Sequence, residues 1–363
     1  MTSSFYKLIF TSIFALIFSN SAQPEIIIGV GGPMTGKHAI KGLAITEGVR
    51  AAINMINFNG GIHQESLSLI VANDQCDSIG ARSAANDLIN RGAFAVIGHP
   101  CKESALSASV IYEDMEVPLF LPDSSDYEIT LQGASNVFRT GSINSEYGIV
   151  AGKWLKKINA TRPALIFQSS LSRKHIVDNT LEYLESIQIH PALYDRIDDS
   201  NKNSGILNRI QAMSVDSIVF VGDSVVLEPY LKSLEYSNNQ VPILIISKKN
   251  FTKNPSTELF ENIVFIQKKE ISKSNLIKLK KWLNPGINIT ASTVRSFAAV
   301  EIWAKAAKLA GLKSIDRLSG VIRIGNYKTI AGEIRFTSSG NRIPIDLELF
   351  KLQNGKKTLV NFD

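Results

Sequence analysis

The chain has 363 residues, of which 44% are hydrophobic and 20% are charged, and its formal net charge is +6. This composition is that of a globular protein and excludes a disordered or fibrous chain, while the length predicts more than one domain. Lysines gather only in residues 273–282, where they alternate with leucines, which favours an amphipathic surface helix over a nucleic-acid patch.

The first 22 residues have the layout of a secretory signal peptide. One basic residue, Lys7, precedes an apolar run from Leu8 to Phe18, and small polar residues end at Ala22. The alternative is an uncleaved anchor, but this apolar run is shorter than the roughly 20 residues that span a bilayer. We therefore expect an exported chain that begins near Gln23.

Only two cysteines are present, Cys76 and Cys101. Export would place them in an oxidising compartment, which favours a disulfide over two free thiols. No CxxC pair accompanies them, and His99 is the single nearby candidate ligand, so we expect no metal site.

From residue 25 onward, short apolar runs alternate with segments of helical periodicity. Strands are predicted at residues 25–30, 67–71, 94–98 and 118–122, and helices at 39–58, 79–91 and 104–115. The alternation resumes with helices at 145–158, 174–187 and 225–236 and strands at 163–167, 217–222 and 241–247. Such alternation predicts parallel βαβ units in two lobes.

The last third of the chain breaks this alternation. A long helix is predicted at residues 294–311, and residues 332–342 and 345–356 read as strands with turns at Ser339-Gly340 and Asn354-Gly355. Two lobes followed by a returning tail suggest a hinged cleft.

The stretch "GGPMTGKH", residues 31–38, approaches a nucleotide-binding P-loop. A P-loop ends in Lys followed by Ser or Thr, whose hydroxyl binds Mg²⁺, and His38 cannot do this. Glycines here also suit a tight strand-to-helix turn that a ligand approaches closely, with Lys37 exposed to solvent. We favour that interpretation over an NTPase.

No catalytic motif is visible. The five histidines form neither HExxH nor another ligand spacing, no GxSxG elbow is present, and the Asp198-Asp199 pair lies in a polar segment. We expect no enzymatic activity and no cofactor.

Several short segments, in order and spacing, resemble the leucine/isoleucine/valine-binding protein family, the type I solute-binding proteins of ABC importers. They are "IIIGVGGPMTG", "INFNGGI", "ANDQCDS", "VIGHPC", "IYEDMEVPLFLP", "VFRTGS" and "AGEIRFTSSGN". The resemblance implies an α/β fold of two doubly wound Rossmann-like lobes, a lobe-one disulfide between the two cysteines, and crossovers after Gly141, near Gln267 and near Leu349. Lobe 1 would hold residues 23–142 and 268–348, and lobe 2 residues 143–267 and 349–363.

The resemblance also implies ligand-binding positions. Ser125 stands where the family binds the ligand carboxylate with a hydroxyl, Asp123 and Ser124 would add backbone groups, and Asn144 is a further candidate. The alternative for the two serines is N-capping of a helix that starts at Tyr127.

Other ligand-binding positions depart from the family pattern. Lys102 replaces a carboxylate-binding serine, Lys41 and Ser172 replace aromatic residues, Asp223 or Ser224 replaces another, and Ser247 or Lys248 replaces the acidic partner of an α-ammonium. If these side chains face the ligand, they disfavour a branched-chain amino acid and favour an acidic amino acid or an organic acid. The alternative is that the lysines point into solvent.

The function that the resemblance implies is solute binding by hinge closure in the periplasm, as a monomer that delivers its ligand to the membrane permease of an ABC importer. A ligand sensor that uses the same cleft is the alternative.

Overall fold

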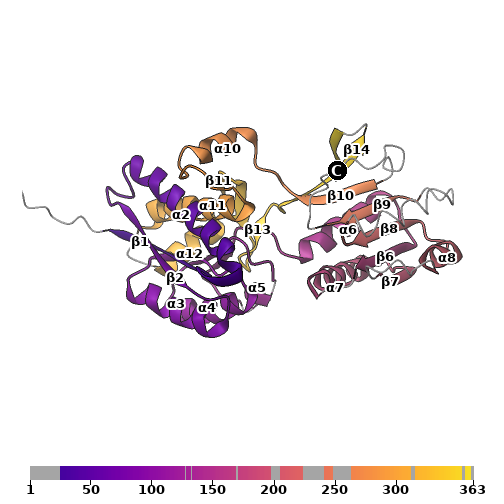
Figure 1. Ribbon diagram of the computed structural model, residues 1–363, viewed down its shortest axis with the longest axis horizontal. Coiled ribbons are helices and arrows are strands. Elements are labelled where there is room, and N and C mark those ends of the chain that lie inside the picture. Colours follow the sequence, from indigo (N-terminus) through magenta and orange to yellow (C-terminus); the bar gives the residue numbers. More distant parts are fainter. Residues whose placement is uncertain are drawn as a thin grey trace, which may run out of the picture.

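The computed structural model describes residues 25–126, 128–131, 133–168, 171–197, 205–223, 241–247, 263–311, 315–353 and 356–360. Within these residues the chain forms two α/β lobes, the first on the left of Figure 1 and the second on the right. The predicted signal peptide, the predicted helix at 225–236 and the turn at Asn354-Gly355 lie outside the described residues.

The first lobe is built on a parallel sheet in the order β2-β1-β3-β4-β5. Its first elements are β1 (Ile26–Gly32), η1 (Gly36–His38), α2 (Ala39–Phe58), β2 (Leu67–Asn73), α3 (Ser78–Asn90), β3 (Ala95–Gly98), α4 (Lys102–Asp114), β4 (Leu119–Leu121), α5 (Glu128–Leu131) and β5 (Val137–Arg139). A later part of the chain completes the lobe with α10 (Lys273–Lys280), α11 (Ala291–Ala310), α12 (Ile315–Ile324), β11 (Tyr327–Thr329), β12 (Gly332–Phe336) and β13 (Arg342–Ile343).

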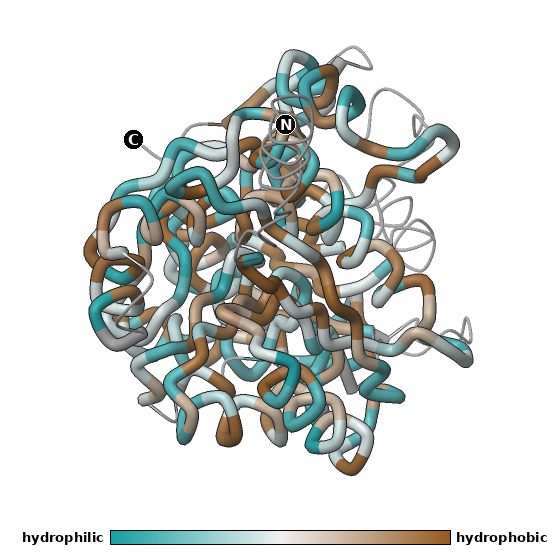
Figure 2. The backbone as a smooth tube through the Cα atoms, turned by 90° about the vertical axis from the view of Figure 1, so that its left-hand side faces the viewer, coloured by the Kyte–Doolittle hydropathy of each residue, from teal (hydrophilic) through white to brown (hydrophobic). Residues whose placement is uncertain are grey.

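Helices cover both faces of the first sheet. Successive residues of a strand point to opposite faces, so Ala95 and Ile97 pack with α2 and α11, whereas Val96 packs with α3 and α4. Helices α2 and α11 approach closely because Gly48 has no side chain: a Cβ there would lie 2.3 Å from the carbonyl oxygen of Thr293. Figure 2, which faces this lobe, shows hydrophobic segments running through its middle.

The second lobe is built on a seven-stranded sheet in the order β15-β14-β10-β9-β8-β6-β7. Strands β6 to β10 are parallel, and β14 and β15 add to the edge in antiparallel fashion. The elements are α6 (Ser145–Lys157), β6 (Pro163–Gln168), α7 (Leu171–Ser186), β7 (Leu193–Ile197), α8 (Gly205–Ala212), β8 (Ser217–Val221), β9 (Ile243–Ile246), β10 (Ile263–Lys268), β14 (Leu347–Gln353) and β15 (Lys356–Val360).

The chain passes between the lobes three times. It does so between β5 and α6, between β10 and α10, and between β13 and β14, and Figure 1 shows the last two passages running side by side. The third passage covers residues 344–346, because β14 begins at Leu347 and pairs with β10 of the second lobe. The part of the chain after β10 therefore completes the first lobe as far as β13 and then returns to the second lobe as β14 and β15.

Most of the predicted elements are confirmed, and the β-rich ending is present. Among the α-helices and strands, the sequence pattern did not predict β5, β7, α8, β10, α12, β11 and β15. Strand β7 was not predicted because it lacks the apolar run that marks its buried neighbours. It is an edge strand, and polar Asp195 and Arg196 lie within it.

Candidate functional site

Both sheets contain a point where the winding direction of the chain reverses. In the first sheet β1 has β2 on one side and β3 on the other, and in the second sheet β6 has β7 on one side and β8 on the other. In open parallel sheets, ligands bind outside the carboxyl ends of the strands at such switch points. The loops that follow β1, β3, β6 and β8 are therefore the places to look for a site.

The loop after β1 contains the glycines that resemble a P-loop. Gly36 has a φ of +74°, a conformation that glycine adopts without strain, and Lys37 is exposed as predicted. The preceding glycines were expected to let a ligand approach closely. At Gly31, however, a side chain of the protein fills the space. A Cβ on Gly31 would lie 2.4 Å from Nε2 of His99, so the missing side chain makes room for the His99 ring.

His99 is fully buried between two partners. Its Nδ1 lies 2.9 Å from Oδ2 of Asp74, and its Nε2 lies 3.1 Å from the hydroxyl of Tyr112. The predicted disulfide between Cys76 and Cys101 is present in the same region. Cys76 lies two residues after Asp74, and Cys101 lies two residues after His99. Together these contacts fix the loop after β3 to the loop after β2.

Lys102 is the first residue of α4, directly after this fixed loop. Its Nζ lies 2.5 Å from a carboxylate oxygen of Glu128 on α5, and the Glu128 carboxylate raises the pKa of Lys102. The lysine side chain is 32% exposed, so it is neither buried nor free of a counter-charge. This partner is not evident from the sequence, because Glu128 lies 26 residues away and reaches α4 only through the fold.

The loop between β4 and α5 carries Asp123, Ser124 and Ser125. Ser124 is 1% exposed, and its hydroxyl has no hydrogen-bond partner among the described residues. Neither serine side chain caps α5 by a hydrogen bond in the described structure. Ser125 is partly exposed, and its carbonyl oxygen accepts a hydrogen bond from the backbone N–H of Asn144, at 3.1 Å. The loop thus lies directly against the start of the second lobe.

A buried arginine, which sequence reasoning did not single out, shapes that loop. Arg139 is fully buried at the end of β5, and its guanidinium donates to the carbonyl oxygens of Ser124 and, at 2.7 Å, of Asp126. Burial lowers its pKa to about 10, so it stays charged near neutral pH. A lone arginine within the apolar run "VFR" was the available signal.

The remaining predicted site residues divide into three groups. Lys41 is partly exposed in the first turn of α2, Asp123 is partly exposed just after β4, and Asn144 is 8% exposed and precedes α6. Ser172 lies in the first turn of α7, beyond β6. Ser224 and Lys248 lie outside the described residues.

The second lobe presents a charge pair at its switch point. A guanidinium nitrogen of Arg173, in the first turn of α7, lies 2.8 Å from a carboxylate oxygen of Asp223, which follows β8. The backbone N–H of Asp223 donates to Oε1 of Gln168, the last residue of β6, at 3.0 Å. Asp223 was a candidate from the sequence, whereas Arg173 and Gln168 were not, although Gln168 ends β6 and Arg173 lies in the first turn of the helix that follows it.

Buried charges surround the passages between the lobes. Asp346 accepts hydrogen bonds from Arg295 of α11, and Arg342 lies 3.5 Å from the same carboxylate oxygen and donates to the carbonyl of Thr140. Glu146, at the start of α6, is 4% exposed, and one of its carboxylate oxygens is unpartnered in the described structure. Burial raises the pKa of Glu146 to about 7, and the positive charge of Arg342 opposes that shift.

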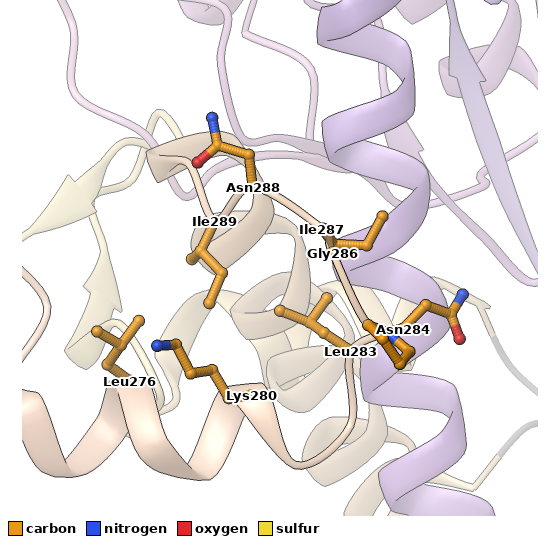
Figure 3. A pocket seen from close by; sticks show the side chains of 9 residues that line it. Leu276, Lys280, Leu283, Asn284, Gly286, Ile287, Asn288 and Ile289 are labelled. Carbon is orange, nitrogen blue, oxygen red and sulfur yellow. The ribbon is translucent and has the colours of Figure 1, made fainter.

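A pocket of about 560 Å³ lies elsewhere on the first lobe, between α10 and the loop that follows it. Figure 3 shows Leu276 and Lys280 from α10 and Leu283 and Ile289 from the loop around a common space. None of its lining residues belongs to the loops at the strand ends, so this pocket is separate from both switch points.

In the part of the chain that the structure describes, no group of three or more His, Cys, Asp or Glu side chains is placed to hold a metal ion. None of the described helices has the length and hydrophobicity that crossing a lipid bilayer requires.

Comparison with known proteins agrees with this architecture. A family model described as "Periplasmic binding protein" matches residues 25–247. Leu/Ile/Val-binding protein homolog 1 of Brucella abortus (strain 2308) is 24% identical over 356 residues, which cover 96% of this chain and 95% of that protein.

Two solved structures share the fold. An ABC transporter substrate-binding protein from Desulfitobacterium hafniense gives a TM-score of 0.72 at 20% identity, over 93% of this chain and 100% of that one. A periplasmic binding protein type 1 from Bordetella pertussis Tohama I gives 0.64 at 17% identity, over the same shares of the two chains. The chain belongs to the periplasmic binding protein family.

Proposed function

We propose that this protein is the periplasmic substrate-binding component of an ABC importer, that it binds an amino acid or a related small carboxylate, and that it passes the solute to a membrane permease. The mature protein begins near Gln23 after removal of the signal peptide and acts as a monomer. It carries out no chemistry on its ligand and binds no nucleic acid.

One observation carries this proposal. In each lobe, the loops at the switch point of a parallel sheet present hydrogen-bonding groups, and three chain segments join the two lobes. A small solute held between two such edges is enclosed when the lobes rotate about the joining segments. The proposed lobe limits keep residues 23–142 in the first lobe and residues 143–267 in the second. The last boundary moves from residue 348 to residues 344–346, because β14 begins at Leu347 and pairs with β10 of the second lobe.

The first lobe supplies the groups that would hold a carboxylate. Ser125 offers a hydroxyl, and the buried hydroxyl of Ser124 has no partner in the described structure, so each can donate to an anion without giving up a side-chain hydrogen bond. Lys102 adds a positive charge whose present partner, Glu128, would share it with the ligand. The names of the relatives, which refer to leucine, isoleucine and valine, support an amino acid as the ligand class.

The test is a thermal-shift panel on the chain from Gln23. It contains leucine, isoleucine, valine, glutamate, aspartate, small dicarboxylates and Mg-ATP. A ligand at 100 times its dissociation constant adds about 2.7 kcal/mol of stability, which a shift in melting temperature reports clearly. We expect at least one amino acid or carboxylate to stabilise the protein and Mg-ATP to have no effect.

Ser125→Ala should weaken the binding of whichever compound stabilises the protein roughly tenfold, because the loss of one hydrogen bond to a charged group costs about 1.4 kcal/mol of binding free energy. Ser186→Ala is the matched control, since Ser186 is an exposed residue at the end of α7 whose hydroxyl bonds only its own helix. If no amino acid or carboxylate shifts the melting temperature, the proposed function is wrong.

A further inference from the structure

We propose that Arg173 and Asp223 select the ligand in the second lobe, and that the bound solute is an α-amino acid whose side chain ends in a carboxylate or a carboxamide. The inference rests on the proposed function and narrows it to one class of amino acid. It assigns Asp223 to the ligand ammonium and Arg173 to the oxygen atoms at the end of the ligand side chain.

The position of the pair supports this assignment. Strands β6 and β8 are hydrogen-bonded neighbours, so the residues that follow them lie side by side at the carboxyl edge of the sheet. Arg173 and Asp223 reach one another across that edge, 2.8 Å apart, at the point where the winding of the second sheet reverses. No other ion pair of the described residues joins the loops after β6 and β8.

The burial of the pair is intermediate. The two side chains are 20% and 24% exposed, so the charges are screened less than those of a surface ion pair and yet remain accessible to a solute. The backbone N–H of Asp223 is held by Gln168, which fixes the start of this loop. The carboxylate is therefore presented from an anchored backbone position.

The chemistry of the pair favours a ligand that carries both charges. An ammonium group pairs with a carboxylate, and the planar fork of a guanidinium matches two carboxylate oxygens or one amide oxygen. An amino acid with a carboxylate or carboxamide side chain offers both partners at once, while its α-carboxylate remains for Ser125 in the first lobe. The ligand thus replaces the contacts that Arg173 and Asp223 make with each other.

The same pair disfavours an aliphatic amino acid. The ammonium of leucine would take Asp223 away from Arg173, and the leucine side chain would offer the guanidinium no acceptor in its place. Closing the lobes would then remove water from an unpaired guanidinium, which is costly. The disfavouring of leucine follows from the Arg173–Asp223 pair and does not depend on Lys41, Lys102 or Lys248. The pair also supplies an acidic partner for the ligand ammonium, which the segment at residues 247–248 does not.

The experiment is isothermal titration of the mature chain with L-glutamate, L-aspartate, L-glutamine, L-leucine and glutarate. Glutarate keeps both carboxylates of glutamate and lacks its ammonium. We expect one of the three polar amino acids to bind at least tenfold more tightly than leucine and at least tenfold more tightly than glutarate.

Four variants locate the effect. Arg173→Ala should lower the affinity for the preferred polar amino acid at least tenfold and leave the affinity for leucine unchanged or higher. Arg173→Lys should restore part of the affinity for the polar amino acid. Asp223→Asn should remove the preference for glutamate over glutarate. Lys174→Ala is the matched control, because Lys174 is the next residue of α7 and pairs with Asp178 on the exposed side of that helix.

The outcomes separate the two proposals. Tightest binding of leucine, with equal affinities in Arg173→Ala and the unchanged protein, would overturn the specificity assignment and leave the solute-binding function standing. Equal losses in Arg173→Ala and Lys174→Ala would also overturn it, since the effect would then follow net charge. Absence of binding by every amino acid and by glutarate would instead count against the proposed function itself.

Discussion

Arg295 and Asp346 form a buried ion pair where the chain makes its last passage between the lobes. A guanidinium nitrogen of Arg295 lies 2.7 Å from Oδ2 of Asp346, and the two residues are 3% and 7% exposed. Arg342 lies 3.5 Å from the same oxygen, so a single carboxylate balances two buried arginines. The segment about which the lobes are proposed to move is thus anchored by charge to the long helix of the first lobe.

Replacing Asp346 with alanine should destabilise the protein strongly. It would leave Arg295 and Arg342 buried without their carboxylate, and breaking a buried pair in this way costs about 3–5 kcal/mol. Urea denaturation followed by circular dichroism measures the loss. Arg91→Ala, which removes an exposed pair with Asp87, should cost no more than about 1 kcal/mol. Equal effects of the two substitutions would show that Asp346 does not have this role.

Glu146 should make stability depend on pH. Its pKa is raised from 4.5 to about 7 by burial, with Asp346 adding to the shift and Arg342 and Arg139 opposing it. Between these two values the folded protein keeps a proton that the unfolded chain has lost, so stability falls as pH rises from about 4.5 to 7. A shift of this size corresponds to about 3 kcal/mol.

Glu146→Gln removes the titrating group and keeps its shape. Urea midpoints for the two proteins, measured from pH 4 to pH 8, should agree at the acid end and separate progressively toward pH 7, with the glutamine variant more stable. Parallel curves across the whole range would contradict the assignment.

The disulfide should contribute substantially to stability. Cys76 and Cys101 close a loop with a sequence separation of 25, and the chain-entropy model gives about 3.5 kcal/mol for a loop of that size. The double variant Cys76→Ala, Cys101→Ala should lose stability of this order. Adding a reductant should lower the melting temperature of the unchanged protein and leave that of the double variant unaltered. A double variant as stable as the unchanged protein would rule out the expected contribution.

Gly31→Ala should destabilise the first lobe by about 1–3 kcal/mol, because the new methyl group would meet the His99 ring at 2.4 Å. The ring cannot move away easily, since Asp74 and Tyr112 hold both of its nitrogens. Adding His99→Ala should cost less in the Gly31→Ala background than alone, and a double-mutant cycle measures the difference.

Gly320→Ala provides the matched control for that substitution. Gly320 lies in α12 with nothing within 4 Å of the Cβ position and no positive φ, so alanine there should stabilise by up to about 1 kcal/mol. The same chemical change is thus expected to have opposite signs at the two positions. Similar effects at both would mean that the His99 contact does not control the result.

The order of strands and helices from β1 to β4 could be predicted because these buried strands are apolar runs and the helices between them repeat with helical spacing. Strand β7 could not, since an edge strand such as residues 193–197 is only half covered and need not be apolar. The cysteine pair was predictable from the export signal and the resemblance. The ligand-binding role proposed for the loop serines rests on the resemblance and stays a prediction.

The sequence by itself determined the fold class and the family, because these depend on local periodicity and on ordered motifs, and it predicts an export signal. The tertiary structure decided which charges meet. Lys102 joins Glu128, Arg173 joins Asp223, and Arg295 joins Asp346, pairs separated by 26, 50 and 51 positions. The physical reason is that an ion pair depends on distances of a few ångströms in space, and only the completed fold brings residues so distant in sequence this close together.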